Sequence, residues 1–467
     1  MPAVVMDFPA ELARILAETP SLSRACLVGG CVRDALLELP VKDYDVECFG
    51  VSYEDLAGEL SKWGRTDLVG KSFGVIKLTT RSGLEYDFAI PRRDNKTGIG
   101  HKGFEVQFDP DITPEEASSR RDFTINSLMY DPREREVLDF HGGVQDLKDR
   151  RLKHTSGAFA EDPLRVLRGM QFAGRFELMA DPSTLELCRE IKHTFPELPI
   201  DRVREEWFKW AIKSRRPSLG ICFLEQAGWL DHFPEIAALR RTEQDPVWHP
   251  EGDVLSHTCH CLDAAVRLPE WDGAGNEFRI PVMFGVLAHD FGKPETTYRE
   301  FKHDRECVVS PGHDETGVPL TESFLDRIGA PNALRKQVPP LVRCHLAHLQ
   351  DITPRSVRRL ARRLAPATIE ELCAVIQADH NGRPPNPPTT PEGLIRLRAK
   401  AEELQLEAAA PKPIVLGRHL IDLGLKPGPE FSRILTAAFE AQLEGKFDDP
   451  ESGCRWVVDE FQIERSA

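Results

Sequence analysis

The chain has 467 residues, of which 41% are hydrophobic and 29% charged, and such proportions are typical of a soluble globular protein with about three domains. Its formal net charge of −15 argues against a general nucleic-acid binder, although a local basic face is enough to bind RNA. No run approaches the roughly 20 apolar residues of a membrane span, and the first residues do not resemble an export signal. We therefore expect a cytoplasmic protein without membrane contact, whose 11 cysteines are reduced.

The first elements lead to a glycine-containing turn. A helix is predicted within residues 1–25, where apolar side chains recur at helical spacing. A short apolar run at 26–28 then ends in Gly29 and Gly30, after which a second helical pattern begins. Glycines at a strand-to-helix turn let the backbone approach a triphosphate, and Arg33 adds a positive fork for phosphate oxygens. We expect Gly30 and Arg33 to bind a nucleotide.

Two aspartates, Asp43 and Asp45, stand at the start of the next predicted strand. Residues two apart in a strand point to the same face, so these carboxylates would project side by side. Adjacent carboxylates repel each other, and a divalent cation between them removes the repulsion. Magnesium is usually held in this way where a nucleotide phosphate is transferred. Asp43 and Asp45 are therefore the predicted catalytic and magnesium-binding residues.

The following segment predicts a helix at 53–63 and two strands, 73–79 and 84–90, around a short turn. Asp87 lies on the second strand and could add a third carboxylate to the pair, the alternative being an ordinary half-exposed strand residue. Residues 91–119 read as a long polar connection, and connections of this length inside a compact domain are usually functional or mobile.

The string Glu161-Asp162-Pro163-Leu164-Arg165-Val166-Leu167-Arg168 predicts a helix start. Asp162, Arg165 and Arg168 are three residues apart, so we expect them on one helical face. Cytosine and adenine both present an exocyclic amine beside an unprotonated ring nitrogen, and an Asp acceptor next to an Arg donor complements that pair. Uracil and guanine present the reverse order and would be refused. One pair of side chains could thus select C and A without a template.

Three motifs together resemble the polymerase-beta-like nucleotidyltransferases. They are the Gly-Gly turn with Asp43 and Asp45, the string RRDFTINSL at 120–128, and EDPLRVLR at 161–168. The closest likeness is to the bacterial, class II branch that contains tRNA CCA-adding enzymes and poly(A) polymerases. The resemblance implies a catalytic head that uses magnesium to transfer nucleotides from CTP and ATP to the 3′ end of tRNA.

The resemblance also implies roles for individual residues. Arg121 would meet phosphates, while Asp122 and Asn126 would approach the sugar, whose 2′-hydroxyl needs both a donor and an acceptor. Asp162, Arg165 and Arg168 would complete the nucleotide site, and residues 91–119 would be a flexible loop needed for the switch to the last nucleotide. Some relatives carry an arginine where this chain has Gln171, which makes Gln171 a doubtful contact and Arg175 its alternative.

Histidines become frequent after residue 243. An adjacent His-Asp pair in an apolar helix packs poorly, because both polar groups need partners inside the protein. The pair and its flanking residues match the pattern of the HD metal-dependent phosphohydrolases, with predicted metal ligands His257, His289, Asp290 and Asp379. His313 and His345 lie where members of that superfamily place ligands for a second metal. Imidazole with carboxylate suits manganese, nickel or cobalt, and also iron or zinc. A degenerate HD domain with a structural role is the alternative.

The predicted fold class is α+β, with a mixed-sheet polymerase-beta-like head followed by all-α domains. The expected domains are the head at 1–150, a helical neck for base and RNA binding at 151–242, an HD domain at 243–385 and a helical tail at 386–467. The predicted function is template-independent addition of CCA to tRNA, with a phosphohydrolase activity in the HD domain. The alternatives are a poly(A) polymerase, an enzyme that adds only CC or only A, and an RNA-binding protein with an inactive centre. The oligomeric state is left open.

Overall fold

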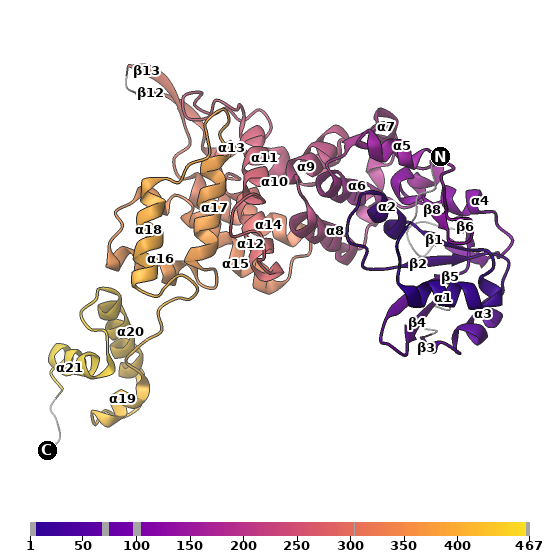
Figure 1. The fold of residues 1–467 in the computed structure, drawn as a ribbon. Helices are drawn as coiled ribbons and strands as arrows, with labels where there is room; N and C mark the ends of the chain where they lie inside the picture. Colours follow the sequence, from indigo (N-terminus) through magenta and orange to yellow (C-terminus); the bar gives the residue numbers. More distant parts are fainter. Residues whose placement is uncertain (1–5, 68–73, 97–103, 303, 464–467) are drawn as a thin grey trace. The chain divides into compact units, whose positions relative to one another are not determined.

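The computed structural model describes residues 6–67, 74–96, 104–302 and 304–463. The chain separates into two compact units, one of residues 1–210 and 219–232, the other of residues 211–218 and 233–467. Figure 1 shows the course of the chain and the labels of its elements. The mixture of one large sheet with many helices confirms the predicted fold class. In the described part of the chain, no helix is long and apolar enough to cross a membrane.

The first unit is built on a seven-stranded sheet with the order β3-β4-β5-β2-β1-β8-β9. β2 and β5 are parallel neighbours, and the other neighbours are antiparallel. Alternate residues of β4 and β5 are buried, as expected of a sheet with its core on one face. Both strands lie where the sequence predicts them. The strands are β1 (Ala25–Val28), β2 (Asp45–Cys48), β3 (Gly64–Asp67), β4 (Val75–Thr80), β5 (Glu85–Ala89), β8 (Met129–Asp131) and β9 (Glu136–Leu138).

Short helices accompany this sheet. The predicted first helix is α1 (Ala10–Glu18), which buries Leu12, Ile15 and Leu16 because these residues share one helical face. The helix predicted at 53–63 is α3 (Tyr53–Leu60), which begins after a side-chain cap at Ser52. The other helices of this part are α2 (Gly30–Leu36), α4 (Pro114–Ser119) and α5 (Gly143–Lys148).

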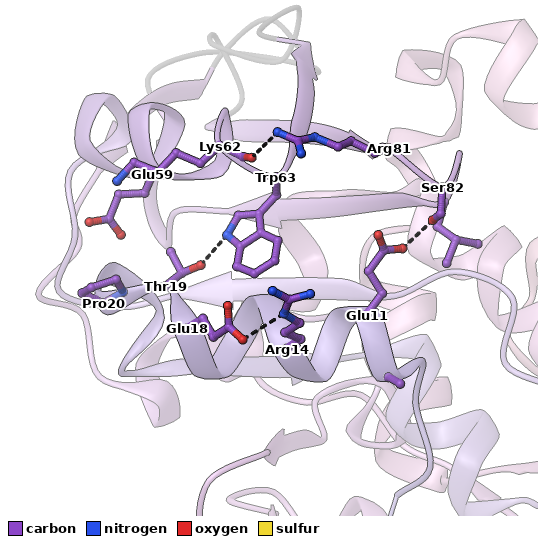
Figure 2. A pocket seen from close by; sticks show the side chains of 12 residues that line it. Glu11, Arg14, Glu18, Thr19, Pro20, Glu59, Lys62, Trp63, Arg81 and Ser82 are labelled. Atoms are coloured by element: carbon purple, nitrogen blue, oxygen red, sulfur yellow. Dashed lines mark hydrogen bonds and ion pairs between the residues drawn. The ribbon is translucent and has the colours of Figure 1, made fainter.

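A cavity of about 860 Å³ lies between α1, the end of α3 and the β4–β5 turn. Figure 2 shows the Trp63 indole inside it, with Nε1 donating to Oγ1 of Thr19 at 2.9 Å. The three carboxylates on its wall, Glu11, Glu18 and Glu59, all accept hydrogen bonds from the chain itself. Two of these bonds tie α1 to Ser82 of the β4–β5 turn and α3 to Ser21, and the third lies within α1.

The connection at 91–119 contains more regular structure than we expected. Strands β6 (Arg92–Lys96) and β7 (Phe104–Phe108) form an antiparallel hairpin, and α4 follows with a capping box at Thr113 and Glu116. Residues 97–103 of the expected loop lie outside the described residues. The prediction of an irregular connection is therefore wrong for these strands and this helix.

The segment after residue 150 is mainly helical, as predicted. Its one small sheet in the first unit pairs β10 (Arg151–Leu152) in parallel with β11 (Met179–Ala180). A 3-10 helix, Gly157–Glu161, precedes α6, which begins only at Leu164. The helices are α6 (Leu164–Phe176), α7 (Pro182–Glu190), α8 (Ile200–Lys213) and α9 (Pro217–Gln226).

The second unit has a core in which α11 packs against α12 and α17, and α12 also packs against α15 and α17. An antiparallel hairpin of β12 (Tyr298–Lys302) and β13 (Arg305–Val309) interrupts the helices, so the prediction of an all-helical domain is wrong here. The helices up to residue 381 are α10 (Pro234–Ala237), α11 (Val254–Ala265), α12 (Asn276–Ala288), α13 (Lys293–Thr296), α14 (His313–Arg327), α15 (Asn332–Cys344), α16 (Pro354–Leu364) and α17 (Ile369–Asn381).

The C-terminal helices form a smaller core of their own. Leu420, Ile434 and Val457 are among its buried members. The helices are α18 (Glu392–Glu403), α19 (Gly417–Asp422), α20 (Pro429–Leu443) and α21 (Pro450–Phe461), which confirm the predicted helical tail.

Candidate active site and metal centre

Two strands of the large sheet bring carboxylates together in the first unit. Asp45 is the first residue of β2 and lies directly opposite Asp87 of the parallel strand β5. The pKa of Asp45 is raised, first by the loss of surrounding water and then, against the attraction of Arg121, by repulsion from Asp87 and Asp43. One buried oxygen of Asp87, Oδ1, accepts no hydrogen bond from the described residues. The sheet thus pairs Asp45 with Asp87, whereas Asp43, expected on the same strand, precedes β2; the repulsion among the three carboxylates and the orphaned oxygen fit a divalent cation.

The glycine turn lies beside this cluster in the fold. Gly29 has φ +72°, and a Cβ at this position would lie 2.8 Å from Nη1 of Arg121. Gly30 is the first residue of α2. Arg33 is buried, donates to Oδ1 of Asn126 and has its guanidinium 4.4 Å from the centre of the Phe176 ring. The structure therefore places Arg33 against its own chain, where it holds Asn126.

The RRDFTINSL residues form a connected polar network. Nδ2 of Asn126 donates to Oδ1 of Asp122 at 3.0 Å, and Nε of Arg168 donates to Oδ2 of Asp122 at 2.7 Å. Burial raises the pKa of the Asp122 carboxyl, but Arg168, Asn126 and the Phe123 amide outweigh burial and hold this pKa below its usual value. Asp122 is therefore a carboxylate in this site.

The expected base-reading residues are arranged differently from the prediction. Asp162 has an extended backbone and precedes α6, so it does not share a helical face with Arg165. Its Oδ2 lies 3.2 Å from Nη2 of Arg202, and its Oδ1 accepts the Leu164 amide hydrogen. Pro163 explains the correction, because a proline suits the first turn of a helix and favours an extended residue before it.

Arg165 itself donates to the carbonyl oxygens of Ala158 and Arg120. Gln171 is 3% exposed, and its Nε2 has no hydrogen-bond partner among the described residues. Arg175, the alternative contact, lies with Nη2 3.7 Å from Oδ2 of Asp34. The structure brings all these side chains into the α6 region of the first unit, and their nucleotide contacts remain predictions.

The second unit gathers the predicted HD residues in one buried cluster. His257 is on α11, His289 and Asp290 follow α12, and Asp379 is on α17. Nε2 of His257 lies 3.1 Å from Oδ1 of Asp379, and Nε2 of His289 lies 3.2 Å from Oδ2 of Asp290. None of these four side chains is more than 5% exposed.

The two further histidines belong to the same cluster. Nε2 of His313, at the start of α14, lies 3.5 Å from Oδ1 of Asp290 and 3.2 Å from Nε2 of His345, which follows α15. Asp290 thus presents Oδ2 toward His257 and His289, and Oδ1 toward His313. Its position between the two groups is that of a carboxylate able to bridge two metal ions.

Each of these histidines has its Nδ1 fixed by the fold. Nδ1 of His289 lies 2.7 Å from the carbonyl oxygen of Val286, and Nδ1 of His345 lies 2.6 Å from that of Val342. Carbonyls at the end of a helix lack intrahelical partners, so these imidazoles satisfy them. Nδ1 of His313 similarly lies 2.6 Å from the Ser310 carbonyl oxygen. With the proton on Nδ1, every Nε2 turns its lone pair into the cluster.

Facing lone pairs repel each other unless a cation lies between them. Burial lowers the pKa of His345 to about 4, so its imidazole is neutral near pH 7, the form that binds metals. Atoms that ligate one ion at about 2.0–2.2 Å are themselves roughly 3 Å apart, which is the spacing of the Nε2 and carboxylate atoms here. The donor set fits divalent metal, and a set of imidazole and carboxylate suits transition metals.

Sequence reasoning missed several residues around this cluster. Oε1 of Glu251 lies 2.7 Å from Nδ1 of His257 and so orients that ring. Nζ of Lys293 lies 2.7 Å from Oδ2 of Asp290, and Nη2 of Arg383 donates to Oδ1 of Asp379 at 2.8 Å. The i+3 and i+4 spacings of Lys293 and Arg383 were readable in the sequence, whereas Glu251 is brought in by a loop. Cys261 is also buried here, with Sγ 3.3 Å from Nε2 of His257.

A family model described as the poly A polymerase head domain matches residues 25–153. This range contains the carboxylates, the glycine turn and the RRDFTINSL network.

Relatives match almost the whole chain. The multifunctional CCA protein of Nitrosococcus oceani is 35% identical over 415 residues, covering 86% of this chain and 93% of that protein. The multifunctional CCA protein of Xanthomonas campestris pv. campestris is 34% identical over 425 residues, covering 88% of this chain and 96% of that protein.

Solved structures show the same fold at lower identity. The CCA-adding enzyme of Bacillus stearothermophilus in complex with CTP has a TM-score of 0.66 and 18% identity, covering 97% of both chains. The Thermotoga maritima CCA-adding enzyme complexed with tRNA has a TM-score of 0.60 and 18% identity, covering 98% of this chain and 97% of that one.

Proposed function

This chain belongs to the family of the multifunctional CCA proteins, and on that premise we propose that it adds C and A nucleotides, from CTP and ATP, to the 3′ end of tRNA. The observation that carries the proposal is the facing pair of Asp45 and Asp87, with Asp43 beside it, in a head that a nucleotidyltransferase-type family model covers. Its head, neck, HD and tail domains are assigned to residues 1–150, 151–242, 243–385 and 386–467.

The chemistry is a nucleotidyl transfer. The terminal 3′-oxygen of the RNA attacks the α-phosphorus of the nucleotide, a new phosphodiester forms, and the bond to the leaving pyrophosphate breaks. Asp43 and Asp45 would hold magnesium, which supplies charge neutralisation at the phosphates. Asp45 and Asp87 are held on adjacent strands of a sheet, a rigid element that positions groups accurately, and Asp43 lies two residues before β2.

The nucleotide is bound by the surrounding residues. Gly30 and Arg121 approach the phosphates, while Asp122 and Asn126 approach the ribose. The buried Arg33 and the Arg168 guanidinium hold Asn126 and Asp122 in place, so the ribose meets a preformed acceptor and donor. Asp162 and Arg165 read the base, supported by Arg202 and by the carbonyls of the preceding turn.

The proposal is tested with tRNA transcripts that end before C, after C, after CC and after CCA, each given one nucleotide at a time. We expect CTP to extend the first two, ATP to extend only the third, and neither to extend the complete end. Repeated addition from ATP would indicate a poly(A) polymerase. Addition of C without A, or of A without C, would indicate a partial enzyme. Binding of tRNA without any extension would indicate an RNA-binding protein with an inactive centre.

A second activity is favoured by a separate observation in the other unit. The Nε2 atoms of His313 and His345 face each other at 3.2 Å while each Nδ1 lies within hydrogen-bonding distance of a carbonyl, an arrangement that a cation between the two Nε2 atoms would stabilise. The cluster would hold manganese, nickel or cobalt through His257, His289, Asp290 and Asp379, with His313 and His345 for a second ion. The bound metal supplies an activated water for hydrolysis of a phosphoester.

The chain's own cations complete this second site. Lys293 and Arg383 line the cavity above the cluster and present positive groups to a phosphate. Nε of Arg383 is buried and has no acceptor among the described residues, so a phosphate oxygen would satisfy it.

The test uses metal-stripped protein, reloaded in turn with manganese, nickel or cobalt and given 2′,3′-cyclic AMP. We expect hydrolysis that Asp290→Asn abolishes, together with loss of metal from that variant in elemental analysis. Absence of both bound metal and hydrolysis in the wild-type protein would show that the HD domain is structural.

A further inference from the structure

A cavity of about 250 Å³ opens above the metal cluster of the second unit. Its lining includes the buried Asp290, His313, His345 and Asp379, and also Lys293 and Arg383. Pockets that enclose a whole small-molecule ligand usually measure roughly 300–1,000 Å³. The cavity is therefore large enough for one end of a substrate, such as a phosphate group, but not for a whole nucleotide.

Trp248 lines the same cavity and is 65% exposed. A large aromatic side chain normally gains free energy by burying its apolar surface. An indole that leaves most of its surface in water does not gain it. A flat ring bound at the rim would cover this surface.

The segment that carries Trp248 is held rigidly. The Asp245 carboxylate accepts two hydrogen bonds from Arg305 of β13, at 2.8 and 2.9 Å, and a third from the amide of Val308 at 3.2 Å. The carbonyl of Asp245 accepts the amide hydrogens of Trp248 and His249, at 3.1 and 2.8 Å. The backbone position of Trp248 is thus fixed before any ligand arrives, which reduces the entropy lost on binding.

We infer that Trp248 is a substrate-specificity residue that stacks the base of a nucleotide whose phosphoester is hydrolysed at the metal cluster. The inference rests on the hydrolase activity proposed above. The enclosed part of the site contains cationic side chains and predicted metal ligands, which match a phosphate. The open part offers the aromatic face of Trp248. Every nucleobase has a face that stacks on an aromatic side chain, so the rim favours nucleotides over esters without a base.

The test compares two esters with the same five-membered cyclic phosphodiester, 2′,3′-cyclic AMP and glycerol 1,2-cyclic phosphate. Stacking contributes equally to the ground and transition states, so its loss raises KM and leaves kcat unchanged. We expect Trp248→Ala in the full-length, metal-loaded protein to raise KM for 2′,3′-cyclic AMP about tenfold, without changing kcat/KM for the glycerol ester.

Trp248→Phe keeps an aromatic face and should retain most of the wild-type KM. The matched control is Phe301→Ala on β12, because Phe301 is 73% exposed and is not among the residues lining the cavity. Equal effects of Trp248→Ala on both esters, or no effect on either, would overturn the inference and leave the hydrolase standing. If the wild-type protein hydrolyses neither ester with any metal, the hydrolase proposal itself is wrong and the inference falls with it.

Discussion

At the scale of single residues, the fold fixes the position of the Arg165 guanidinium. This group donates to the carbonyls of Ala158 and Arg120, which fixes its plane. A guanidinium has five N–H donors, so others remain for a base. The side chain is therefore pre-positioned, and base reading would add no further cost of ordering it.

We predict that Arg165→Ala relaxes base selection. Loss of a bidentate contact costs about 1–3 kcal/mol of discrimination. The kcat/KM values for UTP and GTP should therefore rise relative to those for CTP and ATP. The measurement is kcat/KM for all four nucleotides with a tRNA that ends in CC or before C. If all four values fall by one common factor, Arg165 supports the fold and does not read the base.

Asp122 gives a prediction on the pH dependence of stability. Its pKa is held below the ordinary Asp value, so the carboxylate stabilises the fold above about pH 3.9 and this contribution is lost as the pH falls through the folded-state pKa. Asp122→Asn should therefore lower the Tm of the first unit at pH 7, by about 2–4 °C per kcal/mol lost.

The difference in Tm between wild type and Asp122→Asn should shrink as the pH is lowered from 7 to 3, in calorimetric scans. A difference that stays constant over this range would mean that the charge of Asp122 does not contribute, and that the substitution acts through packing alone.

At the scale of elements, local patterns predicted about half of the elements of the head, and those after β5 were not predicted. The helical spacing of Leu12, Ile15 and Leu16 and the alternation of β4 and β5 are local properties, and the structure confirms all three elements. The β12–β13 hairpin was missed because its strands are short and strongly charged, and because its anchor, the Asp245–Arg305 pair, joins residues 60 apart.

The difference between local patterns and contacts of distant residues also decides which site residues could be predicted. His257, His289, Asp290 and Asp379 could be predicted because each lies on or beside a helix and together they follow a recognisable spacing. Glu251 and Trp248 could not, because a loop held by distant partners places them. Asp162 was expected on a helix, and Pro163 moved the helix start beyond it.

The β6–β7 hairpin carries a prediction on the order of addition. Lys96 and Phe104 pair with each other and flank residues 97–103, which lie outside the described residues. Replacing 97–103 by Asn-Gly, which favours a two-residue hairpin turn, would keep the strands paired and shorten the connection. We expect CC-ended tRNA to accumulate, because the family resemblance implies that this connection takes part in the switch to A. Equal loss of C and A addition would assign the segment to the fold instead.

At the scale of the whole molecule, the two proposed metal sites draw on residues of different units. The head would use the carboxylates of Asp43 and Asp45, a hard oxygen site, whereas the second unit groups imidazoles with carboxylates. Asp43 and Asp290 belong to different units, and among the described residues no predicted ligand belongs to both sites.

The two activities should therefore be separable by substitution. Asp43→Asn should abolish nucleotide addition and spare phosphoester hydrolysis, and Asp290→Asn should do the reverse. Both variants are assayed for both reactions, with magnesium for the first and manganese, nickel or cobalt for the second. Loss of both reactions in either variant would contradict independent sites.

The central claim is that the head completes the CCA end of tRNA and then stops. The most direct measurement is the length of the product, at single-nucleotide resolution, when tRNA lacking CCA is incubated with magnesium, CTP and ATP together. The account predicts a product extended by three nucleotides that ends in CCA, formed by the wild-type protein and not by Asp45→Asn. A ladder of longer A-rich products, no extension by the wild-type protein, or full extension by Asp45→Asn would contradict it.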